Sequence, residues 1–281
     1  MKSPALATLA LICTSAALHA GPVESALVAA MKLPDAPNYT WSTSVDDDAR
    51  SYTIDGKTDR AGDLSLVDMP MVAAMRRRSG RGSSNSENQV TAAFKGDEKL
   101  VLDVNDKWQT PDEIRSAARS DSSGYGGWRG GASGMGRRRG GPGGGPGGRG
   151  GDGSGAPPFS NLQQTLSRPH EEIAIIVANS TDLKAEDDGV SGTLSETGAK
   201  LLLVHPGQTE LTPLRAAGTF RLWVRDGALV KYQVKLEGAL AVNANGTRRE
   251  VEVHQTANTT LSNAGTTAFE VPADAKKKLG G

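Results

Sequence analysis

The sequence predicts an α+β fold in which one antiparallel sheet is interrupted by a long Gly/Arg-rich insertion. Three observations lead to this prediction. Apolar residues alternate with polar ones over many short runs, which is the pattern of strands with one solvent-exposed face. Asp-Gly and Asn-Gly pairs, which favour tight hairpin turns, separate several of these runs. Residues 124–155 hold 18 of the 35 glycines, so the composition of the rest of the chain is ordinary.

The first twenty residues, 1–20, predict a signal peptide. Lys2 supplies a positive charge, residues 5–17 are mostly apolar, and small residues precede a cleavage position after Ala20. A buried N-terminal helix is the alternative. Cys13 is the single cysteine and lies in this segment, so the mature chain would have no disulfide, thiolate metal site or cysteine nucleophile. We therefore expect an exported protein in the periplasm or cell envelope of a bacterium.

Two helices are predicted in residues 21–120. The first covers residues 22–32, and the prolines that follow it disfavour further helix. Its predicted apolar face consists of Val23, Leu27, Val28 and Met31. The second begins at a capping box, in which Thr110 caps the helix and Glu113 follows three residues later. This helix is expected to end near residue 118.

Alternating residues predict strands in both halves of the chain. In the first half they cover residues 39–45, 51–58, 63–69, 90–94 and 99–104. In the second half, hairpins join residues 183–186 to 190–194 and 219–224 to 229–237, and a long strand covers 247–260. We expect residues 205–217 to form a loop and residues 269–272 to close the sheet. Further helices are expected at residues 161–167, 171–178, 195–203 (with Ser195 as its cap) and 273–279.

Residues 121–157 are predicted to be a disordered insertion. Gly, Arg, Ser and Pro dominate this segment, so it cannot bury enough apolar surface to offset its chain entropy. Residues 21–120 and 158–281 are therefore expected to be the N-terminal and C-terminal halves of one domain, with their strands paired into one continuous sheet.

One segment of the second half is similar to a known family. Residues 218–232 contain an alternating strand with Trp223, the turn Asp226-Gly227, and an apolar–basic strand. This segment resembles the β-meander of the bacterial outer-membrane lipoprotein carriers (LolA-like proteins) and related envelope lipid-binding lipoproteins. Other segments that look like strands of this family are residues 94–97, 106–108 and 266–272.

The resemblance implies an unclosed half-barrel sheet covered on its concave face by short helices over an apolar cavity. It also implies lipid or lipoprotein acyl chains as ligands, although no matching motif maps a ligand-binding residue. The chain would then be an exported, non-enzymatic binding protein that holds or transfers a lipid or other apolar ligand in the cell envelope. The alternative is a structural or assembly factor of the envelope that uses the sheet as a protein-docking surface and has no ligand cavity.

Catalytic and cofactor motifs are absent from the sequence. The three histidines outside the signal segment, His170, His205 and His254, have no metal-ligand spacing, and there is no G-x-S-x-G nucleophile elbow. The carboxylate runs 46–48 and 186–188 lack the spacing of a Ca²⁺ loop and are predicted to be solvated turns. The Gly-rich segment lacks the flanking strand and helix of a dinucleotide site. An enzyme is thus a third candidate, which would require a hydrolase activity that depends on His254.

Positive charge gathers in two polar segments although the whole chain has 32 basic and 32 acidic residues. Flexible loops are the simplest interpretation of these segments, and electrostatic contact with an anionic membrane or cell-wall polymer is the functional one. Arg-Gly-Gly triplets are also typical of RNA-binding segments, but export argues against a nucleic-acid partner. The residues predicted to make the electrostatic contact are Arg76, Arg77, Arg78, Arg81, Arg129, Arg137, Arg138, Arg139 and Arg149.

Overall fold

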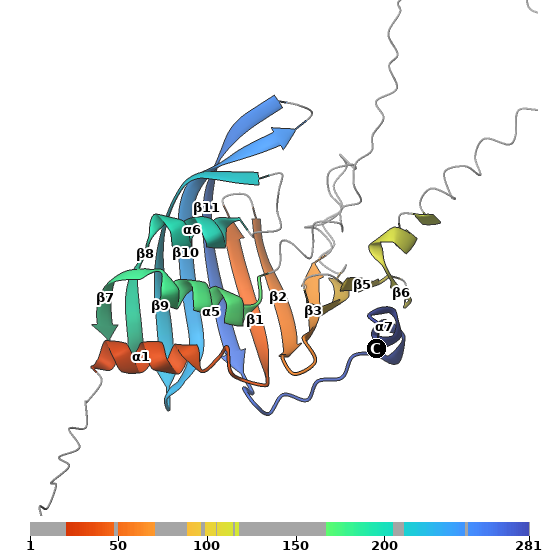
Figure 1. Ribbon diagram of the computed structural model, residues 1–281, viewed down its shortest axis with the longest axis horizontal. Helices are drawn as coiled ribbons and strands as arrows, with labels where there is room; N and C mark the ends of the chain where they lie inside the picture. The colour runs from red at the N-terminus through yellow and green to blue at the C-terminus, as the bar shows by residue number, and fades with distance from the viewer. Residues whose placement is uncertain are drawn as a thin grey trace, which may run out of the picture.

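The computed structural model contains a large, unclosed antiparallel sheet with a few short helices (Figure 1). It describes residues 21–47, 50–70, 89–96, 99–104, 106–114, 116–117, 167–204, 211–244 and 247–280. The predicted signal peptide, all but the last residue of the helix expected over residues 161–167, and the whole Gly/Arg-rich insertion (residues 121–157) lie outside these residues.

Eleven strands make up the sheet. Those of the first half are β1 (Asn38–Asp47), β2 (Arg50–Asp59), β3 (Leu64–Pro70), β4 (Gln89–Lys95), β5 (Lys99–Asp103) and β6 (Trp108–Gln109). Those of the second half are β7 (Ser180–Glu186), β8 (Gly189–Leu194), β9 (Leu211–Arg225), β10 (Ala228–Ala244) and β11 (Thr247–Ser262). The described helices that have full bounds are α1 (Pro22–Met31), α5 (Pro169–Ala178), α6 (Glu196–Leu203) and α7 (Ala273–Lys278).

The strand order is β6-β5-β4-β3-β2-β1-β11-β10-β9-β8-β7, and every neighbouring pair is antiparallel. Each half of the chain is thus a meander of consecutive strands. The two meanders meet where β1 pairs with β11, with Trp41 opposite Leu261. The predicted hairpin between β9 and β10 is confirmed, because Asp226 and Gly227 both have positive φ, as a tight two-residue turn requires.

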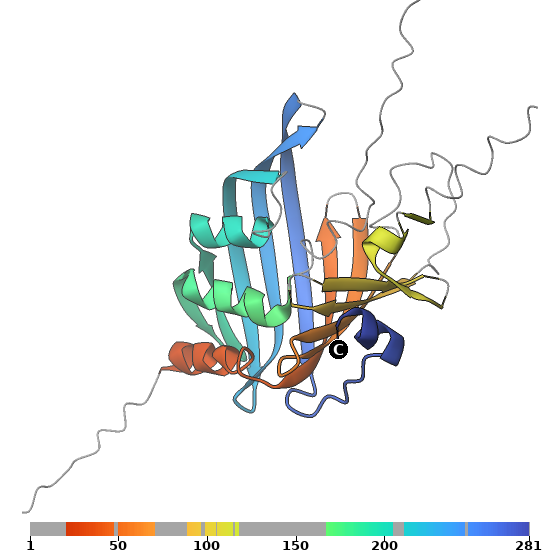
Figure 2. The ribbon, with the colours of Figure 1, turned by 45° about the vertical axis from the view of Figure 1, so that its right-hand side comes forward.

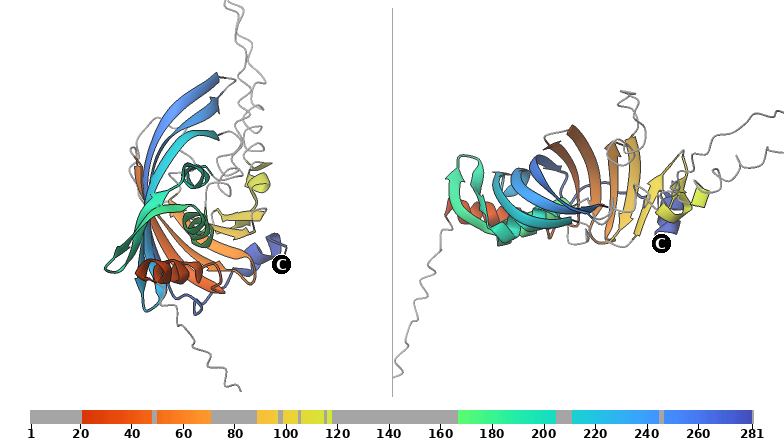
Figure 3. Two further views of the ribbon diagram at one scale, coloured as in Figure 1. Left: turned by 60° about the vertical axis from the view of Figure 1, so that its left-hand side comes forward. Right: turned by 90° about the horizontal axis from the view of Figure 1, so that it is seen from above.

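One face of the sheet carries the main hydrophobic core, and we call it the inner face. Apolar side chains at alternate positions of β1, β3, β4, β9 and β10 are buried there, each with a stabilisation of about 1.5–3 kcal/mol. Gly56 in β2 leaves room for Trp41, since a Cβ at Gly56 would overlap the indole. The sheet is curved, and α5 and α6 lie within its curve on this face (Figure 3).

The helices cover only part of the sheet, so the fold is mostly β. Helices α1 and α6 contact strands β7–β10, and α5 packs against both helices. Helix α7 lies at the other end of the sheet, near β5 and β6 (Figure 2). There it belongs to a second core on the outer face, formed by Ala93, Val101, Val271, Ala275 and Leu279.

The predicted apolar face of α1 is partly wrong. Val23 and Leu27 pack against the main core, but Val28 is 60% exposed and Met31 39% exposed. Val28 lies about 140° around the helix from Val23, because successive helical residues turn by about 100°. The face that is buried instead contains Ala26 and Ala30, whose small side chains let the helix approach the sheet closely.

Two predictions for segments that contain proline are also wrong. Residues 211–217 are not a loop but the first part of β9, where Pro213 is accommodated beside a shift in the pairing with β10. Residues 269–272 do not form a closing strand. Pro272 has no N–H to donate to a ladder, and it caps α7 while Val271 packs in the second core.

Local capping signals are confirmed. The backbone N–H of Thr110 donates to Glu113 Oε2 at 2.8 Å, and the N–H of Glu113 donates back to the Thr110 hydroxyl at 3.3 Å. The described part of that helix covers residues 111–114 and 116–117. Ser195 caps α6 by accepting from the N–H of Gly198 at 3.1 Å. Helix α5 begins at Pro169, which as a first helical residue needs no hydrogen-bond partner for its nitrogen.

Candidate functional site

The first turn of α5 is polar although it lies against the inner face. The N–H of Arg168 donates to Glu171 Oε2 at 3.1 Å, and its side-chain Nε donates to Oε1 at 2.9 Å. Arg168 also forms an ion pair of 2.8 Å with Asp63, in the turn between β2 and β3. These contacts fix the start of α5 over the sheet and direct His170 and Glu172 toward β1 and β10.

His170 is hydrogen bonded to Tyr39 of β1. The Tyr39 hydroxyl donates to Nδ1 of His170 over 2.5 Å, and the backbone N–H of His170 donates to the same hydroxyl over 3.4 Å. Burial raises the pKa of Tyr39 to about 12 and lowers the pKa of His170 to about 4. Both side chains are therefore neutral near pH 7, as this hydrogen bond requires.

Glu172 is hydrogen bonded to Tyr232 of β10. The Tyr232 hydroxyl donates to Glu172 Oε2 over 2.6 Å. Burial raises the pKa of Glu172 to about 7 and raises the pKa of Tyr232 well above its usual value. A carboxyl with this pKa, held by a neutral phenol, changes its charge near neutral pH.

Further polar contacts extend this arrangement across the inner face. The Thr43 and Thr259 hydroxyls are 2.8 Å apart, and Trp41 donates to Thr58, whose hydroxyl is 3.3 Å from Ser65. We call the set the inner-face polar band, which consists of Tyr39, Thr43, Thr58, Ser65, His170, Glu172, Tyr232 and Thr259. It crosses the sheet from β10 to β3, so part of the contact between α5 and the sheet is polar rather than apolar.

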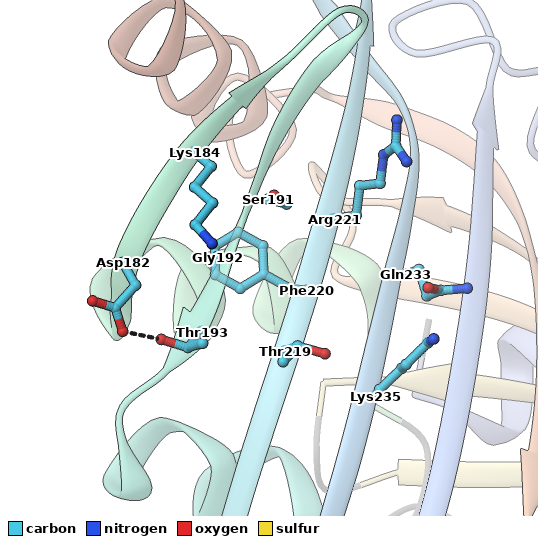
Figure 4. A pocket seen from close by; sticks show the side chains of 10 residues that line it. All are labelled: Asp182, Lys184, Ser191, Gly192, Thr193, Thr219, Phe220, Arg221, Gln233 and Lys235. Atoms are coloured by element: carbon cyan, nitrogen blue, oxygen red, sulfur yellow. Dashed lines mark hydrogen bonds between the residues drawn. The ribbon is translucent and has the colours of Figure 1, made fainter.

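A second feature is a pocket of about 310 Å³ on the outer face, across β7 to β10 (Figure 4). We call it the outer-face pocket. Most of its lining residues are of polar or charged types, and the full set is Asp182, Lys184, Ser191, Gly192, Thr193, Thr219, Phe220, Arg221, Gln233 and Lys235. Three basic side chains and one acidic side chain are among them.

Several lining residues already have partners. Thr193 donates to Asp182 over 2.8 Å, as Figure 4 shows. Arg221 pairs through Nη2 with Asp188 at 3.0 Å and lies 3.8 Å from Glu186. Two lining residues donate outside the pocket, Ser191 to Glu186 and Gln233 to Asn258.

Aromatic and cationic groups gather beside the pocket. The guanidinium carbon of Arg221 lies 4.8 Å from the ring centroid of Trp223, and Nζ of Lys231 lies 4.7 Å from it. At such distances a cation is attracted by the ring face. The outer face of β9 and β10 is thus locally basic.

The structure describes only some of the site residues that were predicted from the sequence. The nine arginines and His205 lie outside the described residues, so the predicted electrostatic contact stays a prediction. His170 belongs to the inner-face polar band, whereas His254 is exposed on β11 opposite Glu237, on the outer face. The two histidines therefore lie on opposite sides of the sheet and cannot share one site.

The carboxylate run 186–188 has a more specific role than that of a solvated turn. Glu186 accepts from Ser191, and Asp188 pairs with Arg221, so this turn holds one wall of the outer-face pocket. Glu172 and the basic lining residues were not predicted from the sequence as site residues. The signal for the lining was available, because Arg221 and Lys235 occupy polar positions of strands whose alternate residues are apolar.

Among the described residues, no group of three or more His, Cys, Asp or Glu side chains could hold a metal ion. In the same part of the chain, no helix combines the length and apolar character needed to cross a membrane.

No protein-family model and no curated protein matches this chain. Among solved structures, it is similar to the crystal structure of a DUF1329 family protein from Desulfovibrio piger. The alignment covers 86% of this chain and 92% of that one, with 9% sequence identity and a TM-score of 0.26. A similarity at this level supports no conclusion about family or ligand.

Proposed function

We propose that the chain is a non-enzymatic binding protein that holds or transfers a lipid or another apolar ligand in the bacterial envelope. The ligand would lie between the inner face of the sheet and its helices. The observation that carries this proposal is the polar attachment of α5 to an apolar surface, through Tyr39–His170 and Tyr232–Glu172. The predicted signal peptide and the LolA-like segment support the location and the ligand class.

The energetics of displacing α5 favour such a role. When the helix moves away, water can replace its polar partners, and a hydrogen bond exchanged in this way costs only about 0.5–1.5 kcal/mol net. Apolar surface exposed by the same motion stays unfavourable unless an apolar ligand covers it. An acyl chain is suited to this exchange, because it replaces the apolar contacts while water solvates the released polar groups.

The inner face offers a long apolar surface for such a ligand. The buried residues of the main core continue from β10 through β1 to the first-half strands β3, β4 and β5. Those in the first-half strands are Val67, Met69, Val90, Ala92, Phe94, Leu100 and Leu102. All of these residues are buried within the protein, as are Ala26 of α1 and Ala199 of α6. Entry of a ligand would therefore displace a helix rather than fill a preformed space there.

Native mass spectrometry tests the proposal on protein purified from the envelope of the bacterium that makes it. If the protein is a carrier, part of the purified sample should have a mass above that of the bare chain. Organic extraction should remove the excess mass, and fragment spectra should identify it as lipid. A protein that arrives with its bare mass, and that takes up no lipid from mixed micelles, would overturn the proposal.

The second candidate is an envelope assembly factor that uses the sheet for protein docking and has no ligand cavity. The filled inner face beneath α1 and α6 is the observation that favours it. This candidate predicts the bare mass in the same experiment, together with a stoichiometric protein partner that survives gentle extraction.

A further inference from the structure

The outer-face pocket contains positive charge that the protein does not neutralise. Lys184 of β7 and Lys235 of β10 line it, and neither makes an ion pair or hydrogen bond with a described residue. Several basic side chains elsewhere on the described surface, by contrast, are paired with acidic ones. Examples are Arg215 with Glu250 and Glu252, Lys200 with Glu196, and Lys278 with Glu113.

Strand pairing arranges the donors of the pocket in two adjacent rows. In one row Lys184 lies opposite Ser191, which lies opposite Arg221. In the other, Thr219 lies between Thr193 and Lys235. Neighbouring strands are about 4.8 Å apart, so the two lysines lie at opposite ends of the pocket with their long side chains free to turn inward. Thr219 and Arg221 lie between them (Figure 4).

Arg221 has a buried donor that lacks an acceptor. Its Nε is inaccessible to solvent and has no hydrogen-bond partner among the described residues. The outer nitrogen Nη2 donates to Asp188 over 3.0 Å. Buried N–H groups without partners are rare in folded proteins, and a rotation of the Arg221 side chain that brings Nε to a ligand oxygen would satisfy this one.

A phosphate group matches these donors better than a carboxylate does. It offers several oxygens in a tetrahedral arrangement, which can accept from ammonium, hydroxyl and guanidinium groups together. Lysine binds phosphate as a flexible point charge, whereas the planar fork of an arginine suits carboxylate and phosphate alike. The Nη2 group of Arg221 already pairs with Asp188, so the guanidinium does not offer its whole fork to a carboxylate.

We propose that the outer-face pocket binds a phosphate group through Lys184, Lys235 and Nε of Arg221, with the Thr219 hydroxyl as a further donor. Asp182, which is held by Thr193 at one end, repels the anion there and directs it toward Thr219. The site lies on the face opposite α5, so it stands independently of the apolar ligand proposed for the inner face. The phosphate could belong to a lipid headgroup or to a soluble phosphate compound.

The test compares two double variants of the full chain. Lys184→Gln with Lys235→Gln removes the two charges of the pocket. Lys57→Gln with Lys277→Gln removes two exposed lysines elsewhere, so the change in net charge is the same. One arm titrates inorganic phosphate at constant ionic strength and follows backbone amide NMR shifts. The other measures co-sedimentation with phosphatidylglycerol–phosphatidylcholine vesicles.

Wild type and the control pair are expected to bind inorganic phosphate saturably, with shifts centred on β8–β10, and the pocket pair to bind at least about tenfold more weakly. A matching loss of vesicle binding in the pocket pair alone identifies the headgroup as the source. An unchanged vesicle arm identifies a soluble phosphate compound. Absence of saturable phosphate binding to wild type, or equal weakening in both double variants, overturns the proposal. Amide spectra of the free variants establish that both are folded.

Discussion

The carboxyl of Glu172 makes folding depend on pH. Burial raises its pKa from 4.5 to about 7, so the folded state holds a proton that the unfolded chain has already released. The associated stability is complete below pH 4.5 and is lost as the pH rises through 7. A shift of this size corresponds to about 3 kcal/mol as an upper bound.

We predict that Glu172→Gln, which keeps a neutral hydrogen-bonding group, gains stability relative to wild type as the pH rises. Urea unfolding at about pH 5 and about pH 7.5 measures this difference, which is expected to grow by roughly 1–3 kcal/mol. His170 acts in the opposite direction, because its lowered pKa removes stability as the pH falls from 6.5 toward 4. A difference between variant and wild type that does not change with pH would contradict the assignment for Glu172.

Tyr39 and His170 form one unit, and a double-mutant cycle should show this. Tyr39→Phe leaves Nδ1 of His170 buried without a donor, which is expected to cost about 1–3 kcal/mol. Adding His170→Phe removes the unpaired acceptor, so the double variant should be more stable than the sum of the two single changes predicts. Additive free energies of unfolding would mean that the 2.5 Å contact contributes no coupling.

Only part of the polar contact between α5 and the sheet could be predicted from the sequence. Alternation in β1 and β10 identified Tyr39 and Tyr232 as buried strand residues. It could not identify their partners, because these come from α5, 131 and 60 residues away along the chain. Side-chain pairs between distant elements depend on tertiary packing, which no local pattern encodes.

At the scale of elements, the sequence predicted turns and helix caps reliably. It was less reliable for which face of a helix is buried. The turn at Asp226-Gly227 and the caps at Thr110 and Ser195 depend on neighbouring residues only, and all three are confirmed. The buried face of α1 depends on what the helix packs against. Proline was also a misleading signal. It favoured a loop over residues 205–217, but Pro213 is accommodated in β9 beside an irregularity in the pairing with β10.

Helix α1 offers a direct test of its orientation. Ala30 is fully buried, so Ala30→Leu should overpack the core and destabilise the protein by about 1–3 kcal/mol. Val28 is mostly exposed, and Val28→Lys should change the free energy of unfolding by no more than about 0.5 kcal/mol. Chemical denaturation measures the free energy of unfolding of both variants. A larger loss for Val28→Lys than for Ala30→Leu would mean that the face predicted from the apolar pattern is the buried one.

At the scale of the whole molecule, the two halves of the chain depend on each other through the pairing of β1 with β11. Replacing residues 122–156 by a short Gly/Ser linker is therefore predicted to leave the melting temperature nearly unchanged. Calorimetry of this deletion variant should show one cooperative transition. Two independent transitions, each reproduced by an isolated half of the chain, would contradict the single-domain prediction.

The proposed function requires α5 to leave the inner face when an apolar ligand enters. Hydrogen–deuterium exchange with and without palmitate measures this most directly. We expect saturable binding, faster exchange of the α5 amides between residues 170 and 178, and slower exchange in the first-half strands that carry the apolar core residues. Palmitate that leaves the exchange of both α5 and the sheet unchanged would contradict it.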